Sequence, residues 1–311
     1  MRRRRRLMGM KQILVMMAAV VLVGCSKDTP ENSQTAEAEA QVASKPTPEP
    51  VPPSDEKLIA DAIFDRQVRI SLPKPVGELT AGVLGKVTEL GLWRSVGTEI
   101  TDEVLKKVAK LQNLKKLGLT HYKITDAGLR EVAKLQKLEE LRLEGTQITD
   151  AGLKDVAKLQ KLEGLMLPAQ ITDAGLKEVA KLQKLERLKL EDTKITDEGL
   201  KNVVKLQGLG SLDLDNTQIT DAGFKEVAKL QNLWYLTIKN TQITDAGLKD
   251  VAKLQKLSFL YLNNTKITDA GLMEVAKLQK LGFLYLLGTK VTKEGVAELK
   301  KALPNCEITG P

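Results

Sequence analysis

The sequence predicts an α/β solenoid, a curved stack of strand–helix units with parallel strands on the concave face and helices on the convex face. Three observations lead to this prediction. A segment like residues 138–161 recurs along most of the 311-residue chain, with a period of 24 and a single 23-residue unit. Each unit opens with Leu-x-x-Leu-x-Leu, and each closes with apolar residues at helical spacing. The units begin at Leu114, Leu138, Leu162, Leu185, Leu209, Leu233, Leu257 and Leu281.

The opening half of each unit has the two-residue period of a strand. In the unit that begins at Leu138, Leu141 and Leu143 would face the core, whereas Glu140 and Arg142 would face the opposite side. A unit of this kind can bury its apolar side only against its neighbours. The units must therefore stack, and the two ends of the stack must be capped.

The closing half of each unit has the three- and four-residue spacing of a helix. Thr149 is a suitable N-cap, Asp150 lies in the first turn, and Leu153, Val156 and Ala157 share one face. Neighbouring strands lie about 4.8 Å apart and neighbouring helices about 8 to 10 Å apart, so a stack of such units curves with its strands inside.

A threonine ends the strand half of most units, and its hydroxyl is expected to bind the turn backbone from the inside. These residues are Thr146, Thr193, Thr217, Thr241, Thr265 and Thr289. The alternative is a row of modified threonines. Tyr122 and the 23-residue unit, which reads Pro168-Ala169-Gln170, interrupt the row, so local irregularity is expected near residues 120 and 168.

The Leu-x-x-Leu-x-Leu pattern, the 24-residue period and the recurring Ile-Thr-Asp-Ala-Gly-Leu segment resemble a bacterial type of leucine-rich repeat over roughly residues 87–308. The resemblance implies a recognition scaffold and does not name a ligand. Residues 57–86 would form an N-terminal cap, residues 87–302 the repeats, and residues 303–311 a half-repeat that closes the C-terminal end. Cys306 occupies a leucine position in that half-repeat, which favours a core thiol over a reactive or disulfide-bonded one.

The first 24 residues have the order of a signal peptide. A basic region from Arg2 to Lys11 precedes an uncharged apolar run, Ile13 to Val23. Eleven helical residues at about 1.5 Å each are too short to span a bilayer. The closing Leu-Val-Gly-Cys resembles the lipobox of bacterial lipoproteins, which implies that Cys25 becomes the lipidated first residue of an exported protein; the alternative is a structural thiol.

The resemblance to lipoproteins also bears on location. Ser26 after the cysteine, by analogy with lipoprotein sorting, favours the outer membrane over the inner membrane of the cell envelope. Met1, Met8 and Met10 all remain possible starts, because each leaves a complete leader.

Residues 25–56 would be the lipidated cysteine and a disordered tether. This segment holds six of the eleven prolines and no aromatic residue, so it cannot bury enough apolar surface to fold. The prolines are Pro30, Pro46, Pro48, Pro50, Pro52 and Pro53.

Aromatic residues mark the candidate ligand site on the concave face. Six of the ten aromatic residues fall in the last three complete units: Trp234, Tyr235, Phe259, Tyr261, Phe283 and Tyr285. Adjacent strands would bring these side chains together beside Asp213 and Asp215, and an exposed aromatic patch usually marks a contact site for a protein, peptide or glycan. Two alternatives remain: a packed cross-strand ladder that only stabilises the sheet, or a patch covered by the cap.

Other function classes have less support. With one histidine, His121, and two cysteines, the chain lacks the residues of ordinary zinc sites, and no cofactor or metal is expected. His121 reads as a surface turn residue. An enzyme would have to use the carboxylates of Asp213 and Asp215 as an acid–base pair on one strand face. A self-associating envelope protein is a further alternative.

The net charge of +8, from 48 basic and 40 acidic residues, first suggests an anionic partner. Loss of residues 1–24 leaves 42 basic and 40 acidic residues, and residues 57–311 retain 40 basic and 33 acidic ones. The lysines of the folded part lie mostly on the predicted helices, interleaved with carboxylates and without aromatic residues for base stacking. Nucleic acid is therefore not an expected partner.

Overall fold

The computed structural model describes residues 62, 64–72, 78–92 and 100–311. All of them belong to one compact unit, Val51–Pro311. The predicted signal peptide, the lipidated Cys25 and the tether up to residue 56 lie outside the described residues.

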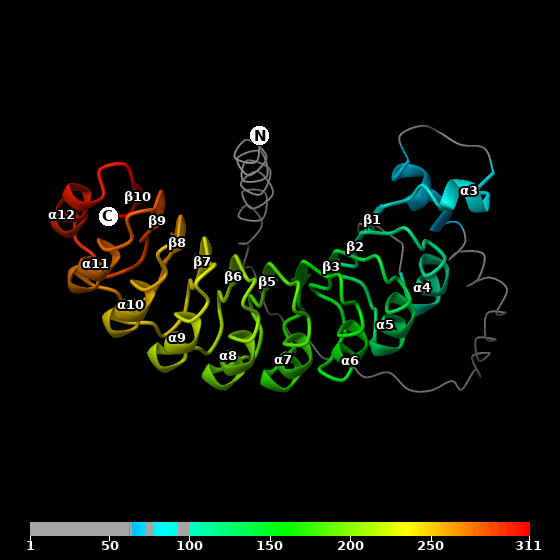
Figure 1. The fold of residues 1–311 in the computed structure, drawn as a ribbon, viewed down its shortest axis with the longest axis horizontal. Helices are drawn as coiled ribbons and strands as arrows, with labels where there is room; N and C mark the ends of the chain where they lie inside the picture. The colour runs from blue at the N-terminus through cyan, green and yellow to red at the C-terminus, as the bar shows by residue number, and fades with distance from the viewer. Residues whose placement is uncertain (1–61, 63, 73–77, 93–99) are drawn as a thin grey trace, which may run out of the picture. The chain divides into compact units, whose positions relative to one another are not determined.

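The strands form one ten-stranded parallel sheet in sequence order (Figure 1). They are β1 (Glu89–Gly91), β2 (Lys116–Gly118), β3 (Glu140–Arg142), β4 (Gly164–Met166), β5 (Arg187–Lys189), β6 (Ser211–Asp213), β7 (Tyr235–Thr237), β8 (Phe259–Tyr261), β9 (Phe283–Tyr285) and β10 (Glu307–Thr309). Equivalent residues of successive units pair, as Leu141 does with Leu165. The predicted parallel sheet is confirmed.

The helices are α3 (Ala81–Leu84), α4 (Asp102–Val108), α5 (Asp126–Val132), α6 (Leu153–Val156), α7 (Asp173–Val179), α8 (Asp197–Val203), α9 (Asp221–Val227), α10 (Asp245–Val251), α11 (Asp269–Val275) and α12 (Lys293–Ala302). Helices α4 to α12 lie side by side on the outer side of the sheet, as predicted, and α3 lies at the N-terminal end of the stack (Figure 1). Residues 64–70 are also helical. In the described part of the chain, no helix is both long enough and apolar enough to cross a membrane.

Threonine caps most helices, but the unit used for the sequence prediction is the exception. Thr220, for example, is the N-cap of α9, and its hydroxyl accepts a hydrogen bond from the Ala222 amide. The N-cap position of α6 is Gly152, because this helix begins only at Leu153. The prediction that Thr149 caps the helix of its unit is therefore wrong in position, although its hydroxyl still accepts a hydrogen bond from the Ala151 amide.

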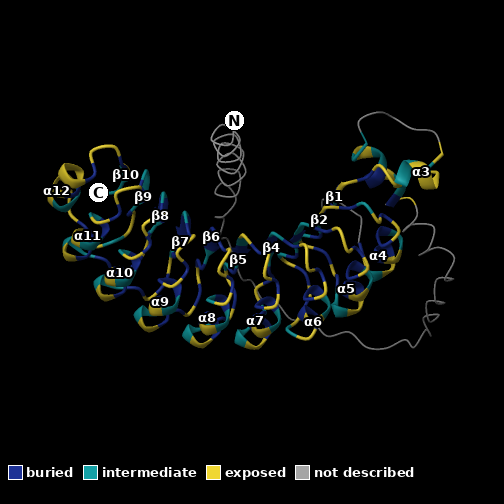
Figure 2. Cartoon of the chain, viewed as in Figure 1, coloured by how far each residue is buried: buried dark blue, intermediate teal, exposed yellow. Residues whose placement is uncertain are grey.

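A continuous layer of buried leucine, isoleucine and valine fills the space between the sheet and the helices (Figure 2). The threonine row closes this layer at the strand ends, as predicted: Thr146 Oγ1 donates to the Leu143 carbonyl oxygen at 2.7 Å, and the equivalent threonines do the same. In the 23-residue unit, the Gln170 side chain instead donates to the Thr146 and Ile148 carbonyl oxygens of the preceding unit.

The C-terminal end also follows the prediction for Cys306. Its side chain is 1% exposed, and it is a free thiol. Burial raises the pKa of the thiol to about 11, so Cys306 is a poor nucleophile at neutral pH.

A carboxylate connects each helix to the next unit. The Asp197 side chain accepts hydrogen bonds from the backbone amide and the hydroxyl of Thr220, at 2.8 and 2.6 Å. The same carboxylate passes close to Gly223, where a Cβ would lie 2.3 Å from Asp197 Oδ1. We call this arrangement the Asp–Thr–Gly relay. The other aspartates that accept such bonds are Asp102, Asp126, Asp150, Asp173, Asp221, Asp245 and Asp269.

A second row runs along the turns that follow the strands. One residue in most of these turns has a positive φ: His121, Gly145, Asp192, Asn216, Asn240, Asn264 and Gly288. Four of them form a hydrogen-bonded ladder, because each asparagine amide donates to the side-chain oxygen one unit earlier. His121 is thus an exposed turn residue, as predicted, with φ 63°.

Candidate functional site

Strands β7 to β9 assemble the aromatic residues into two rows on the concave face. Strand pairing aligns Tyr235, Phe259 and Phe283 in one row, and it aligns Tyr261 with Tyr285 in the other. Trp234 precedes β7 and lies over Gly210, whose Cβ, if present, would be 2.6 Å from the indole Nε1. We call these six side chains the aromatic cluster.

The rings of the aromatic cluster pack closely against one another. Phe259 and Phe283 stack with centroids 4.8 Å apart and planes 3° apart. Tyr261 and Tyr285 stack at 4.4 Å and 6°. Tyr235 joins the two rows, at 6.1 Å from Phe259 and 5.4 Å from Tyr261. Such pairs add to stability beyond the area they bury, so the cluster is rigid.

We expected all six rings to be exposed, and this prediction is wrong for two of them. Tyr235 and Phe259 are only 7% and 5% exposed, because neighbouring rings cover them. Trp234, Tyr261, Phe283 and Tyr285 remain half-buried, and Leu287 beyond β9 is 50% exposed. The packed-ladder interpretation therefore describes the inner layer of the cluster, and the half-buried rings with Leu287 form its accessible layer.

The two carboxylates beside the cluster do not form the expected pair on one strand face. Strand β6 ends at Asp213, and Asp215 lies beyond it, 2% exposed. The Asp215 carboxylate accepts hydrogen bonds from the Thr237 hydroxyl and from the Lys239 amide, and it forms an ion pair with Lys239 Nζ at 2.8 Å. These contacts hold Asp215 as a structural link to the next unit and leave it no room to act as an acid or a base.

Asp213 has a different environment. One of its carboxylate oxygens accepts a hydrogen bond from the Asp215 amide at 3.0 Å. Burial, followed by the nearby negative charge of Asp215, raises the pKa of Asp213 to about 7. Lys189 lies on the adjacent strand, but its ion pair is with Glu191, at 2.5 Å. Asp213 is thus a desolvated carboxylate at the edge of the aromatic cluster, and its charge depends on pH near neutrality.

The phenol group of Tyr261 stays protonated at neutral pH. Burial, and then the neighbouring Tyr285, raises the pKa of Tyr261 to about 12. Lys239 Nζ lies 5.8 Å from the centre of the Tyr261 ring, within the range of a cation–π contact. The accessible layer therefore offers hydroxyl groups and ring edges to a ligand.

The predicted site omitted Lys239, Asn263 and Leu287, although the repeat register alone places them at outward positions equivalent to those of the predicted residues. Thr237 occupies such a position too, but it is only 1% exposed. Asn263 Oδ1 is buried and accepts no hydrogen bond from any residue that the structure describes. Asn263 follows β8, so its side-chain oxygen is a hydrogen-bond acceptor beside the aromatic cluster.

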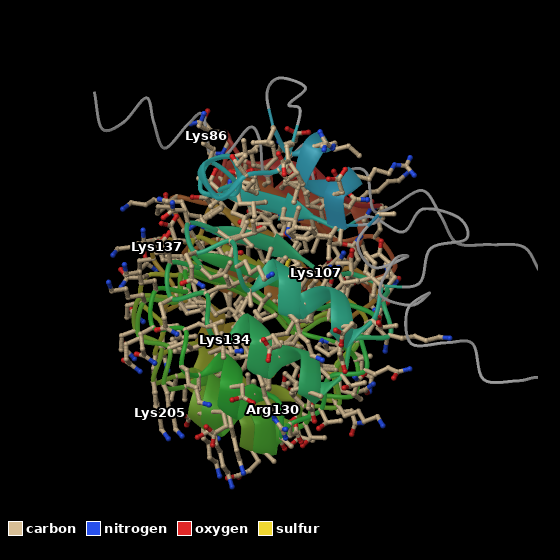
Figure 3. The ribbon with its side chains drawn as sticks, turned by 90° about the vertical axis from the view of Figure 1, so that its right-hand side faces the viewer. Lys86, Lys107, Arg130, Lys134, Lys137 and Lys205 are labelled. Carbon is tan, nitrogen blue, oxygen red and sulfur yellow. The ribbon has the colours of Figure 1, made fainter. Side chains whose placement is uncertain are left out.

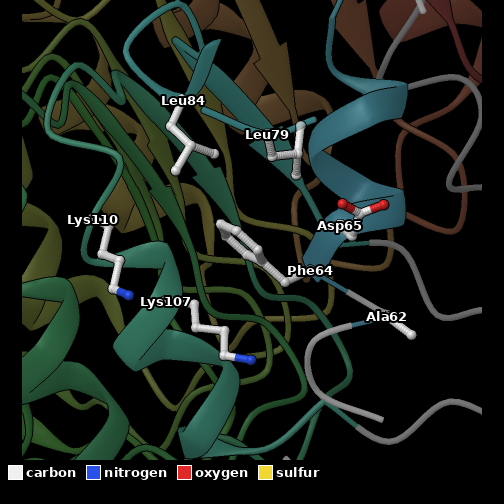
Figure 4. Close-up of a pocket in the computed structure, with 7 residues that line it drawn as sticks. All are labelled: Ala62, Phe64, Asp65, Leu79, Leu84, Lys107 and Lys110. Carbon is white, nitrogen blue, oxygen red and sulfur yellow. The ribbon is translucent and has the colours of Figure 1, made fainter. Parts of the chain in front are cut away.

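The rest of the described chain offers little for catalysis. Among the described residues, no group of three or more His, Cys, Asp or Glu side chains could hold a metal ion. A cavity of about 490 Å³ lies away from the concave cluster, between the N-terminal helical segment and α4 (Figure 4). It is lined by Ala62, Phe64, Asp65, Leu79, Leu84, Lys107 and Lys110, a set that contains no Ser, Thr, Cys or His.

Comparison with known proteins supports the repeat assignment. A family model described as "Leucine Rich repeat" matches residues 134–157 and 181–204. No curated protein matches the sequence. Among solved structures, the chain is similar to an internalin C2 from Listeria monocytogenes, at 28% identity and a TM-score of 0.49, over 80% of this chain and 92% of that chain. It is also similar to a second internalin from the same organism, at 19% identity and a TM-score of 0.42, over 80% and 94% of the two chains.

Both TM-scores are below 0.5, so the fold assignment rests on the chain's own parallel sheet and on the matched repeats. The sheet, the outer helices and the recurring Leu-x-x-Leu-x-Leu strands all agree with the leucine-rich repeat assignment. The chain carries leucine-rich repeats, stacked as an α/β solenoid.

Proposed function

We propose that this protein is a membrane-anchored recognition module that binds a protein, peptide or glycan through the aromatic cluster of its concave face. Repeat solenoids commonly use their extended concave surface for binding. The anchor would be a lipid on Cys25 of an exported chain, in the bacterial cell envelope and preferably in the outer membrane. This part of the proposal is supported by the leader sequence alone.

The observation that carries the proposal is the two-layer arrangement of the cluster. Tyr261, Phe283 and Tyr285 are partly accessible, and Leu287 is exposed beside them. Tyr261 packs against Tyr235 and stacks on Tyr285, and Phe283 stacks on Phe259, so neighbouring rings restrict the rotamers of these side chains before any ligand arrives. A preorganised aromatic surface loses little side-chain entropy on binding, which favours a contact site.

The test is crosslinking from this surface in whole cells. A photoreactive residue at position 287 should capture a reproducible partner, identified by mass spectrometry. Replacing Tyr261 and Phe283 together by alanine should abolish the capture, because both changes remove accessible ring surface. The control replaces Lys116 and Arg187, two outward residues of earlier strands, by alanine and should leave the capture intact. Equal capture by all three proteins would refute the proposed site.

The anchor needs a separate test. The Cys25→Ala protein should lose a radiolabelled fatty acid and leave the membrane fraction, while its concave site still captures the partner after purification. Retention of the label by the alanine variant would show that Cys25 is not the lipidated residue.

A further inference from the structure

The outer surface of the helices carries two rows of basic side chains, which differ in whether their members form ion pairs with acidic residues of the same helix. In six units, one lysine follows the helix and pairs with an acidic residue three positions earlier, as Lys158 does with Asp155. The equivalent pairs have N–O distances of 2.5 to 2.7 Å and involve Lys134, Lys158, Lys181, Lys229, Lys253 and Lys277. We call these six lysines the paired row. Each is neutralised by its own helix.

The second row lies within the helices and has no such neutralisation. It consists of Arg130, Lys154, Lys177, Lys225 and Lys249, which occupy the same position in their units and are all exposed. Within the described residues, none of the five forms an ion pair. We call them the outer row. Figure 3 shows Arg130, with Lys134 and Lys205, among the side chains of the helical side.

The nearest candidate counter-charges are already engaged. The aspartate at the start of each helix accepts hydrogen bonds from the threonine of the following unit, as Asp221 does from Thr244. The acidic residue that follows each outer-row cation pairs with the paired row, as Glu226 does with Lys229. The outer row therefore presents uncompensated positive charge in a line across successive helices.

Three units show how this charge could have been removed. Lys106 and Lys201 occupy the outer-row position of α4 and α8, but Glu103 and Glu198 in their own helices pair with them, each at 2.5 Å. Met273 takes the position in α11 and is 61% exposed. The outer row is consequently made of two segments, Arg130 to Lys177 and Lys225 to Lys249, on either side of a neutralised unit.

We propose that the outer row is a second interaction surface, separate from the concave site, that binds an acidic polysaccharide along the convex helices. Neighbouring helices are about 8 to 10 Å apart, so the charges of the row recur at the scale of one or two sugar residues of an extended chain. A flexible chain can follow the outward curve of the helices, whereas a flat lipid surface would meet only a few of them. The row contains no aromatic residue for stacking on bases, which disfavours single-stranded nucleic acid.

The test compares two variants that lose the same number of charges. One carries Lys154→Gln, Lys177→Gln, Lys225→Gln and Lys249→Gln in the outer row. The other carries Lys158→Gln, Lys181→Gln, Lys229→Gln and Lys253→Gln in the paired row. Binding of each mature chain, with Cys25→Ser so that no lipid contributes, is measured on immobilised polygalacturonate at low ionic strength. All eight lysines are exposed, so thermal unfolding should confirm that both variants fold.

We expect the outer-row variant to bind at least about tenfold more weakly, and the paired-row variant to bind within about threefold of the parent, since exposed ion pairs contribute modestly and locally. Equal losses would show that only net charge matters, and would overturn the proposal. Failure of the parent chain to bind polygalacturonate would overturn it as well. Binding to phosphatidylglycerol vesicles with the same ranking of variants, and not to polygalacturonate, would assign the row to a membrane surface instead.

Discussion

The Asp–Thr–Gly relay makes a prediction about why a glycine stands inside nearly every helix. Gly223 lies in α9, where glycine is unfavourable, and Ala should stabilise an ordinary helix by about 1 kcal/mol. At this position, however, the added Cβ would lie 2.3 Å from Asp197 Oδ1 and 2.9 Å from Asp197 Cγ. Gly223→Ala must therefore displace the Asp197 carboxylate.

The cost follows from the two hydrogen bonds that this carboxylate accepts from Thr220, at 2.8 and 2.6 Å. A shift of roughly 1 Å would take both beyond hydrogen-bonding distance, and bonds to a charged group contribute about 1.5 to 3 kcal/mol. Two such bonds contribute about 3 to 6 kcal/mol, so after the gain in helix propensity Gly223→Ala should destabilise its unit by about 2 to 5 kcal/mol. In an Asp197→Ala background no carboxylate is displaced, and only the flexible Leu200 side chain, whose Cδ1 lies 2.8 Å from the added Cβ, has to shift. The same change should then be neutral or stabilising, which gives a coupling energy of about 3 to 6 kcal/mol.

Hydrogen exchange of the segment around residues 209–233, followed by mass spectrometry, measures this locally and does not require the whole solenoid to unfold in one step. Gly208→Ala is the matched control, because its Cβ would meet nothing closer than the Leu185 carbonyl oxygen at 3.6 Å. A coupling energy near zero between positions 197 and 223 would refute the steric explanation for the glycine.

Two other predictions concern single side chains. The raised pKa of Asp213, about 7, means that the folded protein binds this proton more tightly than the unfolded chain does, so stability is lost as pH rises from about 4 to about 7. Asp213→Asn should therefore be more stable than the parent at pH 8, by roughly 1 to 4 kcal/mol, and similar to it at pH 4, as measured by urea unfolding at both values; an equal difference at both values would contradict the buried charge. Cys306, buried and with its pKa raised to about 11, should react with a thiol reagent in the Cys25→Ser chain only at the rate of unfolding; rapid reaction in the native state would show that the C-terminal half-repeat opens.

The sequence was sufficient for the features that depend on repetition. The two-residue period of residues such as Leu141 and Leu143 identifies the strands, and the recurring Thr146-type residue identifies the turn closure. Both features follow from local geometry, and each unit repeats the evidence. Local geometry was also enough to place His121 in an exposed turn and Cys306 in the core.

The candidate site was less predictable, because its properties depend on contacts between units. Tyr235 occupies an outward strand position like that of Glu140, yet it is buried, since rings on neighbouring strands are large enough to cover it. Asp215 looked like the strand partner of Asp213, but a strand of three residues ends before it. A pattern of alternation indicates which way a side chain points and gives no information on what covers it.

The Asp–Thr–Gly relay was not predicted either, although the sequence shows, at both ends of the stack, the residues at which the relay stops. The first unit has Val104 where later units have glycine, and no acceptor aspartate of a described unit precedes it. The last unit keeps Gly295 to accommodate Asp269 but has Lys293 in place of the next aspartate. A unit added before the first would direct its carboxylate at the Val104 side chain, and a unit added after the last would find no carboxylate for its threonine. End-to-end stacking of two copies would therefore lack the contact that joins successive units within the chain, which argues against polymerisation by continuation of the repeats.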